Sequence, residues 1–413
     1  MSYLMDYKRL ILNWQEKLKK VSPLKRDISF NYEYLQLNKI ITFVWPRRAG
    51  KTYFMFYILR ELIEDKKIQL EQVVFVDFTS FLDNEFNVEK LLEDFYLLYP
   101  DKTPFFVFDE IQELKDFEKV VMYLFNMGFK IFLSGSNSKL LSSQLSTIFR
   151  GRTIDVKVFP LNFKEFLYFK WVDVKSYTEQ QLWLLKNKFV EYLKFGWYPE
   201  IALAENEVTK LDLINQYFTI LLYKDLLERY GIENEYVIKY LIKRILYSVS
   251  KEFSVQKVFN DLKSQWIKIW KQTIYNYLEY LREIFFVHEV LNLVKQWRKF
   301  FLYDVGYNNI YLIENYGYRF ENIILNHLKQ KYKSVFYLKQ NNYEVDFIVE
   351  ELDLAIQVCY ELNEENFERE INWLQKVKAK NKYLVYFNKT VNKAVSEINI
   401  VSFFDFLNFT DNA

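Results

Sequence analysis

Five short, continuously apolar runs alternate with helix-length segments between residues 38 and 160, and they constrain the fold more than any other feature of the chain. The runs are KIITFVW (39–45), QVVFVDF (72–78), PFFVFDE (104–110), KIFLSGS (130–136) and TIDVKVF (153–159). A run that is apolar at every position, rather than at alternate ones, suits a strand buried on both faces. Such strands form parallel sheets that helices cover on both sides. The region therefore predicts an α/β core.

The rest of the chain predicts further domains, as a length of 413 residues suggests. Helical periodicity follows Pro160, and a second α/β pattern closes the chain. We expect an N-terminal helical segment (1–37), the α/β core (38–160), a helical lid (161–235), a basic helical domain (236–305) and a C-terminal α/β domain (306–413).

Composition excludes several classes of protein. Lys and Arg number 56 against 54 Asp and Glu. The net charge of +2 is too small to create an overall positive field that would attract nucleic acid or an anionic membrane. The single cysteine, Cys359, allows no internal disulfide. The sequence has only two histidines, His288 and His327, so a zinc site built from Cys and His is disfavoured. The N-terminal segment predicts an amphipathic helix rather than a signal peptide, and no apolar run approaches the roughly 20 residues that span a bilayer. We expect a cytoplasmic protein with no membrane partner.

Gly50, Lys51 and Thr52 follow the first apolar run and begin the helix-length segment KTYFMFYILRELIED. Backbone N–H groups at a helix start favour anions, and a glycine lets a phosphate approach closely. Lys51 would bridge the β and γ phosphates of ATP, and the Thr52 hydroxyl would hold Mg²⁺. The predicted nucleotide-binding residues are Arg48, Ala49, Gly50, Lys51, Thr52 and Tyr53.

An acidic pair supports this interpretation. Asp109 ends the third apolar run, where it can reach Mg²⁺, and Glu110 follows it, where it can orient an attacking water. The alternative is a chance GKT at a helix start with acidic residues at a strand end. Trp45 stands where a phosphate loop usually has its first glycine. The backbone amides of residues 48–52 suffice for nucleotide binding. Whether the site hydrolyses ATP or only binds it stays open at this point.

The segment WPRRAGKT resembles the GPRRxGKT loop of an archaeal and bacterial family of AAA-type ATPases with a C-terminal nuclease-like domain, related to the STAND class of switch ATPases. The resemblance continues through FDEIQEL (108–114), LSGSNSKLLSSQLSTIFRGR (133–152), FPLNFKEFL (159–167), FGWYPEIALAE (195–205), DLLERYGIEN (225–234), FENIILNHL (320–328) and YEVDFIV (343–349). It implies an α/β P-loop NTPase core of AAA type, with a helical lid, a winged helix-turn-helix and a restriction-endonuclease-like α/β domain.

The resemblance also implies roles for single residues. Ser136 or Asn137 would sense the γ phosphate, and Arg150 and Arg152 would be sensor or finger arginines. Pro199 would contact the base from the lid. Surface arginines and a turn proline are the alternatives. Self-association is possible, because related switch ATPases assemble when open.

The basic helical domain predicts DNA contacts. Residues 236–300 hold 12 Lys and Arg against 5 Asp and Glu, a balance of +7. Three helical stretches and two strand-like runs follow the order of a winged helix. The predicted contacts to double-stranded DNA are Lys271, Gln272, Thr273, Tyr275 and Asn276 on the third helix, with Lys295, Arg298 and Lys299 on the wing. A protein-binding module remains the alternative.

The C-terminal domain resembles nucleases of the PD-(D/E)xK type, but its site is degenerate. Asp346 is kept, whereas Gln357 and Cys359 stand where glutamate and lysine would sit. Glu321 and Glu344 could add carboxylates, and Lys339 could replace the missing lysine. We therefore predict a binding domain, with a metal-dependent DNA nuclease as the minor alternative.

Together these features predict an ATPase that uses ATP and Mg²⁺ and couples its ATP or ADP state to DNA binding. A nucleotide-dependent binding module that does not hydrolyse ATP is the main alternative.

Overall fold

The computed structural model describes residues 6–44, 46–80, 86–135, 149–172 and 178–412. Trp45, Ser136 and Asn137, singled out above, lie outside these ranges. By packing, the chain divides into two compact units: residues 1–173 with 198–200, and residues 174–197 with 201–413. The predicted lid is therefore shared between the two units, and the finer domain boundaries stay predictions.

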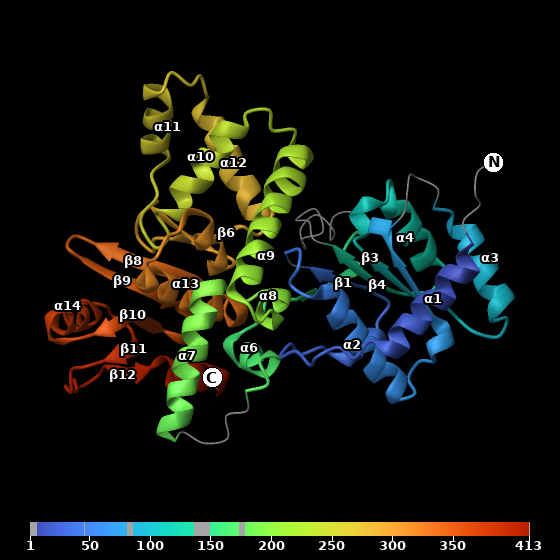
Figure 1. Ribbon diagram of the computed structural model, residues 1–413, viewed down its shortest axis with the longest axis horizontal. Helices are drawn as coiled ribbons and strands as arrows, with labels where there is room; N and C mark the ends of the chain where they lie inside the picture. Colours follow the sequence, from blue (N-terminus) through green and yellow to red (C-terminus); the bar gives the residue numbers. More distant parts are fainter. Residues whose placement is uncertain (1–5, 45, 81–85, 136–148, 173–177, 413) are drawn as a thin grey trace. The chain divides into compact units, whose positions relative to one another are not determined.

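A five-stranded parallel sheet forms the centre of the first unit (Figure 1). Its strands are β1 Ile40–Val44, β2 Val73–Asp77, β3 Phe105–Asp109, β4 Lys130–Gly135 and β5 Thr153–Lys157, in the order β2-β3-β4-β1-β5. Each strand lies within one of the apolar runs, so the predicted α/β core is confirmed. The strands are parallel, so their carboxyl ends lie at the same edge of the sheet. Since β4 lies between β1 and β3, the carboxyl ends of these three strands are neighbours there.

Helices cover both faces of this sheet, because neighbouring strand residues point to opposite sides and nearly all of them are apolar. Phe43 and Phe132 pack with α2 on one face, whereas Phe106 and Phe108 pack with α3 and α4 on the other. The helices of this unit are α1 Tyr7–Lys20, α2 Lys51–Glu64, α3 Val88–Leu98, α4 Phe117–Asn126 and α6 Phe163–Phe169, with 3-10 turns η1 Tyr32–Leu35, η2 Leu70–Gln72, η3 Phe78–Ser80 and η4 Ile111–Glu113.

The second unit begins with helices. They are α7 Glu179–Phe195, α9 Glu207–Ile220, the π-helical segment η6 Leu221–Glu228, α10 Glu235–Leu246, α11 Val255–Ser264 and α12 Lys271–Glu283. The short helix α8, Pro199–Leu203, starts in the 198–200 segment of the first unit. Strands β6 Val287–Leu291 and β7 Arg298–Leu302 form an antiparallel hairpin after α12. Three helices followed by a hairpin is the order predicted from the sequence.

A mixed five-stranded sheet ends the chain, in the order β12-β11-β10-β9-β8. Strands β8 to β10 are antiparallel, whereas β10 to β12 are parallel. The elements are η7 Val305–Tyr311, α13 Tyr316–Lys331, β8 Val335–Gln340, β9 Tyr343–Val349, η8 Glu350–Leu352, β10 Leu354–Leu362, α14 Glu364–Gln375, β11 Asn381–Lys389, β12 Asn399–Ser402 and α15 Phe403–Asn412. Within the described ranges, no helix is long and apolar enough to cross a membrane.

Candidate functional site

The loop between β1 and α2 has the backbone of an anion-binding turn. Gly50 is the N-cap of α2, and its φ of +91° is left-handed, where glycine meets little steric cost. An added Cβ would lie 3.4 Å from Nη1 of Arg26 and 3.5 Å from Cγ of Pro199. Since glycine has no side chain to cap the helix, the first N–H groups of α2 are left to bind an anion.

Lys51 is held close to this loop. Its side chain is buried, with 4% of its surface exposed, and Nζ donates a 3.0 Å hydrogen bond to the carbonyl oxygen of Pro46. Arg48 has a left-handed backbone and lies at the surface, and Tyr53 is exposed on the first turn of α2. The predicted nucleotide-binding residues 48–53 thus form one continuous turn around the start of α2.

Three polar side chains meet at the carboxyl ends of β3 and β4. Thr52 Oγ1 donates a 2.6 Å hydrogen bond to Oδ2 of Asp109, and Ser134 Oγ donates to Oδ1. Burial, followed by the nearby charge of Glu110, raises the pKa of Asp109 to about 6. A hydroxyl and a carboxylate are oxygen ligands of the kind that Mg²⁺ takes together with phosphate oxygens and water. Thr52 and Asp109 therefore fit the ion.

Glu110 is held in a strained conformation next to this pair. Its φ of +50° lies in the left-handed region, which costs a residue with a side chain roughly 1–2 kcal/mol. Its N–H donates to Ser134 Oγ at 3.2 Å, and its carboxylate accepts a hydrogen bond from Gln112. Backbone strain is concentrated where a reacting group must be held in one orientation. The arrangement is compatible with a carboxylate that orients water.

Arg26 is a site residue that sequence reasoning missed. It is buried, and Nη1 donates to the carbonyl oxygen of Ala49 at 3.0 Å. Nε donates to Oε1 of Glu165 at 2.6 Å, and Nη2 to the carbonyl oxygen of Phe159 at 2.6 Å. The Arg26 guanidinium thus connects the phosphate loop to the start of α6 through hydrogen bonds to both. No local motif marks Arg26, because these partners lie 23, 139 and 133 residues away.

Replacing Arg26 by leucine is expected to lower the free energy of unfolding by about 3–5 kcal/mol, because Glu165 would remain buried without its cation. Urea unfolding followed by circular dichroism measures this change. The double variant Arg26→Leu with Glu165→Met should recover part of the loss, whereas the exposed control Arg9→Leu should change little. A loss under about 1 kcal/mol for Arg26→Leu would contradict the role.

For Arg150 and Arg152, the predicted sensor role within their own chain requires a correction, whereas the finger role toward a neighbouring chain stays a prediction. They lie just before β5, and the carbonyl oxygen of Arg152 accepts a hydrogen bond from Ile40, at the start of β1. The phosphate loop follows Val44, at the other end of β1, about 13 Å along the strand. Arg152 lies instead over the ring of Phe125, 5.6 Å from its centroid. The sheet therefore separates both arginines from a phosphate bound in their own chain.

Pro199, predicted to contact the base, lies next to the turn at the start of α2, and its nucleotide contact stays a prediction. Its Cγ is next to Gly50, and the following residue, Glu200, forms an ion pair with Arg48 at 3.3 Å. The segment 198–200 belongs to the first unit, although the chain on both sides of it belongs to the second.

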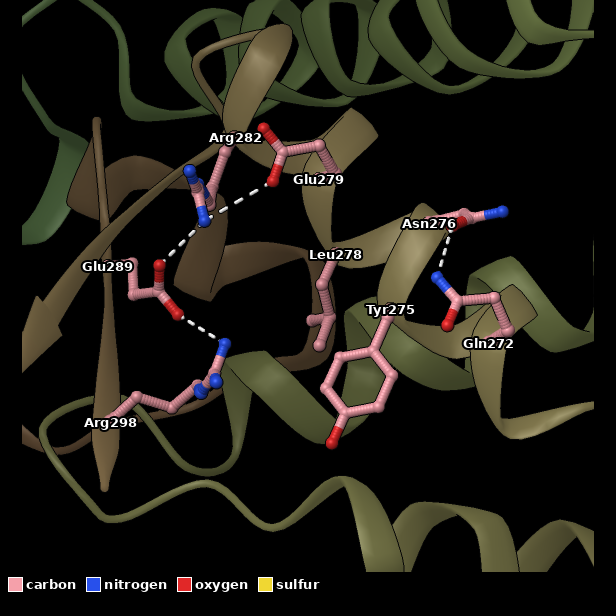
Figure 2. Close-up of a pocket in the computed structure, with 8 residues that line it drawn as sticks. All are labelled: Gln272, Tyr275, Asn276, Leu278, Glu279, Arg282, Glu289 and Arg298. Atoms are coloured by element: carbon pink, nitrogen blue, oxygen red, sulfur yellow. Dashed lines mark hydrogen bonds and ion pairs between the residues drawn. The ribbon is translucent and has the colours of Figure 1, made fainter. Parts of the chain in front are cut away.

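The exposed face of α12 carries the amides predicted to meet DNA (Figure 2). Lys271, Gln272, Tyr275 and Asn276 are exposed, whereas Thr273 is half-buried. Gln272 Nε2 donates to Oδ1 of Asn276 at 3.0 Å. The structure thus gathers four of the five predicted α12 residues on one accessible face.

A cavity of about 290 Å³ lies between α12 and the hairpin β6–β7. Figure 2 shows Glu289 between Arg282 and Arg298. Its Oε2 lies 2.6 Å from Nη1 of Arg282, and its Oε1 lies 2.6 Å from Nη1 of Arg298. Arg298, a predicted DNA contact, is therefore already neutralised in part by Glu289. Lys295 is exposed at the hairpin and lies 3.9 Å from the ring centroid of Trp297.

Lys299 corrects the predicted DNA surface, because it is buried rather than exposed. Only 1% of its side chain is exposed, and Nζ lies 2.6 Å from Oε1 of Glu344 and 3.5 Å from Oε1 of Glu321. Burial alone would lower the pKa of Lys299, but the charges of Glu321, Asp346 and Glu344 prevail and raise it. This ammonium cannot reach a phosphate of DNA in this fold.

Of the residues predicted for a degenerate nuclease site, Glu321 and Asp346 lie within reach of the Lys299 charge, whereas Gln357 and Cys359 have other neighbours. Burial raises the pKa of Asp346, and its Oδ2 accepts a 2.9 Å hydrogen bond from the N–H of Val358. Gln357 Nε2 donates to Oε2 of Glu370 at 2.7 Å, and burial raises the pKa of the Cys359 thiol to about 12. In the described ranges, no group of three or more His, Cys, Asp or Glu side chains is arranged to hold a metal ion. An ammonium from β7 balances these carboxylates instead.

Comparison with known proteins defines the class first. Residues 37–167 match the protein family described as AAA domain, which agrees with the parallel sheet and the phosphate loop. Residues 186–312 match a domain of unknown function, DUF8612. Residues 37–167 of the first unit therefore form an AAA-type P-loop domain. Neither match names a nuclease fold, so that part of the resemblance stays a proposal.

The chain belongs to the family of an uncharacterized protein of Methanocaldococcus jannaschii, MJ1544, to which it is 35% identical over 389 residues, 90% of this chain and 85% of the relative. An uncharacterized protein of Haemophilus influenzae is 29% identical over 341 residues, 78% of this chain and 82% of that protein.

Two solved structures are similar at low identity. The Aeropyrum pernix Orc1 protein in complex with DNA is 10% identical, covers 75% of this chain and 93% of its own, and has a TM-score of 0.30. Cdc6p from Pyrobaculum aerophilum is 13% identical, covers 75% and 98%, and has a TM-score of 0.28. Scores this low carry no argument about function.

Proposed function

We propose that this protein is an ATP-binding, Mg²⁺-dependent ATPase of the AAA type that acts as a switch, coupling its nucleotide state to DNA binding. The observation that carries the proposal is the contact of Thr52 with Asp109, 2.6 Å long, at the glycine-capped start of α2. It joins a phosphate-binding turn to a carboxylate at the end of a parallel strand, which is what a Mg·nucleotide requires.

Each residue has a defined task in this proposal. Lys51 and the N–H groups of residues 48–52 bind the phosphates, while Thr52 and Asp109 hold Mg²⁺, which neutralises charge on the phosphates when bound. Glu110 orients the attacking water. Asn137 is the proposed γ-phosphate sensor. Arg150 and Arg152 have no role at this site within their own chain.

The segment 198–200 supports the switch. Pro199 lies against Gly50, and Glu200 pairs with Arg48, so phosphate binding at this turn changes the surroundings of both residues. The second unit begins again at residue 201. A movement of residues 198–200 at the nucleotide site would therefore be transmitted through the backbone to residue 201, where the second unit continues.

For the second unit we propose a winged helix formed by α10 to α12 and β6–β7, with DNA contacts from Lys271, Gln272, Tyr275 and Asn276. The balance of +7 over residues 236–300 favours a polyanion. The C-terminal sheet is proposed to be nuclease-like in fold but to bind rather than cut, because Lys299 balances the carboxylates that a metal would need. Plasmid incubated with Mg²⁺ or Mn²⁺ should stay intact.

Replacing Glu110 by glutamine is expected to reduce the ATPase rate at least 100-fold while ATP binding persists, because the amide cannot accept a proton from the attacking water. Steady-state phosphate release and calorimetry with Mg·ATP measure the two properties. The matched control is Glu113→Gln on η4, which should retain most of the rate.

A Glu110→Gln protein that turns over ATP normally would contradict the assigned role. A wild-type protein that binds ATP but never hydrolyses it would instead favour the nucleotide-dependent binding module.

A further inference from the structure

The turn between α11 and α12 closes α11 with a left-handed residue, and that residue is Trp266. Its φ is +61°, its N–H donates to the carbonyl oxygen of Lys263 at 3.0 Å, and the N–H of Ile267 donates to that of Leu262 at 3.1 Å. This pair of bonds is the Schellman motif, whose left-handed position usually holds glycine. A bulky aromatic residue there destabilises the turn.

Helix α12 also begins against local preference. Its N-cap is Trp270, which supplies no side-chain hydrogen bond to the helix, whereas Ser, Thr, Asp and Asn are favoured at this position. Burial does not compensate for either tryptophan, because Trp266 is 93% and Trp270 83% exposed. Residues that break local rules without a local gain mark functional positions.

Three lysines flank the tryptophans. Lys263, Lys268 and Lys271 are all exposed. No carboxylate of the described ranges lies within ion-pair distance of any of the three. We call residues 263–271 the Trp turn: two open indole rings among three cations that are not neutralised locally.

We propose that the Trp turn binds single-stranded nucleic acid, with Trp266 and Trp270 stacking on bases and the lysines contacting phosphates. The inference deepens the DNA-binding part of the proposed function and rests on it. Positive charge combined with open aromatic faces is the usual chemistry of single-strand binding, because each base offers a π-face and each nucleotide a phosphate. Intact duplex fits less well, since its base faces are covered by their neighbours.

A membrane surface is disfavoured by the residues around the rings. The nearest apolar side chains of α11 and α12, Leu262 and Ile274, are fully buried, and the two isoleucines of the Trp turn, Ile267 and Ile269, are half-buried. The two indoles therefore do not extend an apolar face of the kind that an interfacial helix inserts into lipid.

The test measures binding of the full-length protein to fluorescein-labelled oligothymidylate and to a duplex of the same length by fluorescence anisotropy. Trp266→Gly and Trp270→Ser should each weaken oligothymidylate binding by about 5- to 100-fold and duplex binding much less. Trp266→Gly should not lower the melting temperature, because glycine suits the left-handed position. Loss of binding therefore cannot be attributed to unfolding.

The matched control is Trp171→Gly. Trp171 has the same left-handed backbone after α6, with a φ of +56°, and is 75% exposed, but its ring lies 6.3 Å from that of Tyr168. This variant should bind oligothymidylate as the wild type does.

Four results would overturn the inference. If the wild type binds duplex and both Trp-turn variants bind oligothymidylate as the wild type does, the inference is wrong and the proposed function stands. Equal losses for both nucleic acids would remove the single-strand preference. Tryptophan-dependent binding to anionic phospholipid vesicles in place of oligothymidylate would assign the turn to a membrane. No binding to either nucleic acid would also refute the DNA-binding part of the proposed function.

Discussion

Lys51→Met is expected to weaken Mg·ATP binding by roughly 100-fold or more, and ATP turnover with it. Methionine keeps the buried aliphatic stem but removes the ammonium, so the phosphates lose their main fixed cation. Truncating one partner of a buried, hydrogen-bonded charge pair costs about 2–5 kcal/mol, which is the size of this effect. Isothermal titration calorimetry with Mg·ATP measures it directly.

The matched control for this variant is Lys119→Met, since Lys119 is 79% exposed on α4. It should bind Mg·ATP as the wild type does. Binding of Mg·ATP by Lys51→Met within about threefold of the wild type would show that the turn at α2 does not bind phosphate through this residue, and the proposed function would fail.

Lys299→Met is expected to lower the free energy of unfolding by about 3–5 kcal/mol, the usual cost of leaving buried charges without their partner. The Lys299 ammonium lies 2.6 Å from Glu344 and 3.5 Å from Glu321. Its removal leaves Glu321 and Asp346 buried without this cation, while Glu344 keeps Lys339 at 3.2 Å. Urea unfolding measures this loss, in the transition that belongs to the second unit.

Two further variants separate this role from the DNA contact first expected. Lys295→Met, on the exposed turn of the same hairpin, should leave stability unchanged. Combining Lys299→Met with Glu321→Gln should recover part of the stability, because one fewer buried carboxylate would remain without its cation. If Lys299→Met instead unfolds like the wild type but binds DNA more weakly, the buried assignment is wrong.

The sequence predicted the first sheet well because its signal is local. Strands such as Phe105–Asp109 are apolar at each of their first four positions, a pattern that suits only a strand covered on both faces. The order β2-β3-β4-β1-β5 was not predicted, since neighbours in a parallel sheet are chosen by packing between distant segments. The same locality explains why the start of a helix at Lys51, directly after the glycine, could be predicted from the sequence.

Charged residues were harder to place. Arg26 binds partners more than 130 residues away, and Ser134 contacts Asp109 only because β4 lies next to β3. Lys299 and Lys295 look alike in the sequence, yet one is buried and the other exposed. Strand β7 is buried from Lys299 to Leu302, and α13 and β9 supply the carboxylates that pair with Lys299 there.

The sequence by itself determined the phosphate-binding turn, the acidic pair and the buried parallel strands, because each depends on residues adjacent in the chain and on backbone geometry that they impose. The tertiary structure decided which cation meets which anion: Arg26 with Glu165, Lys299 with Glu344, and Arg152 at the sheet edge away from the phosphate loop. Coulomb interactions act through space and depend on burial, so no local pattern records them.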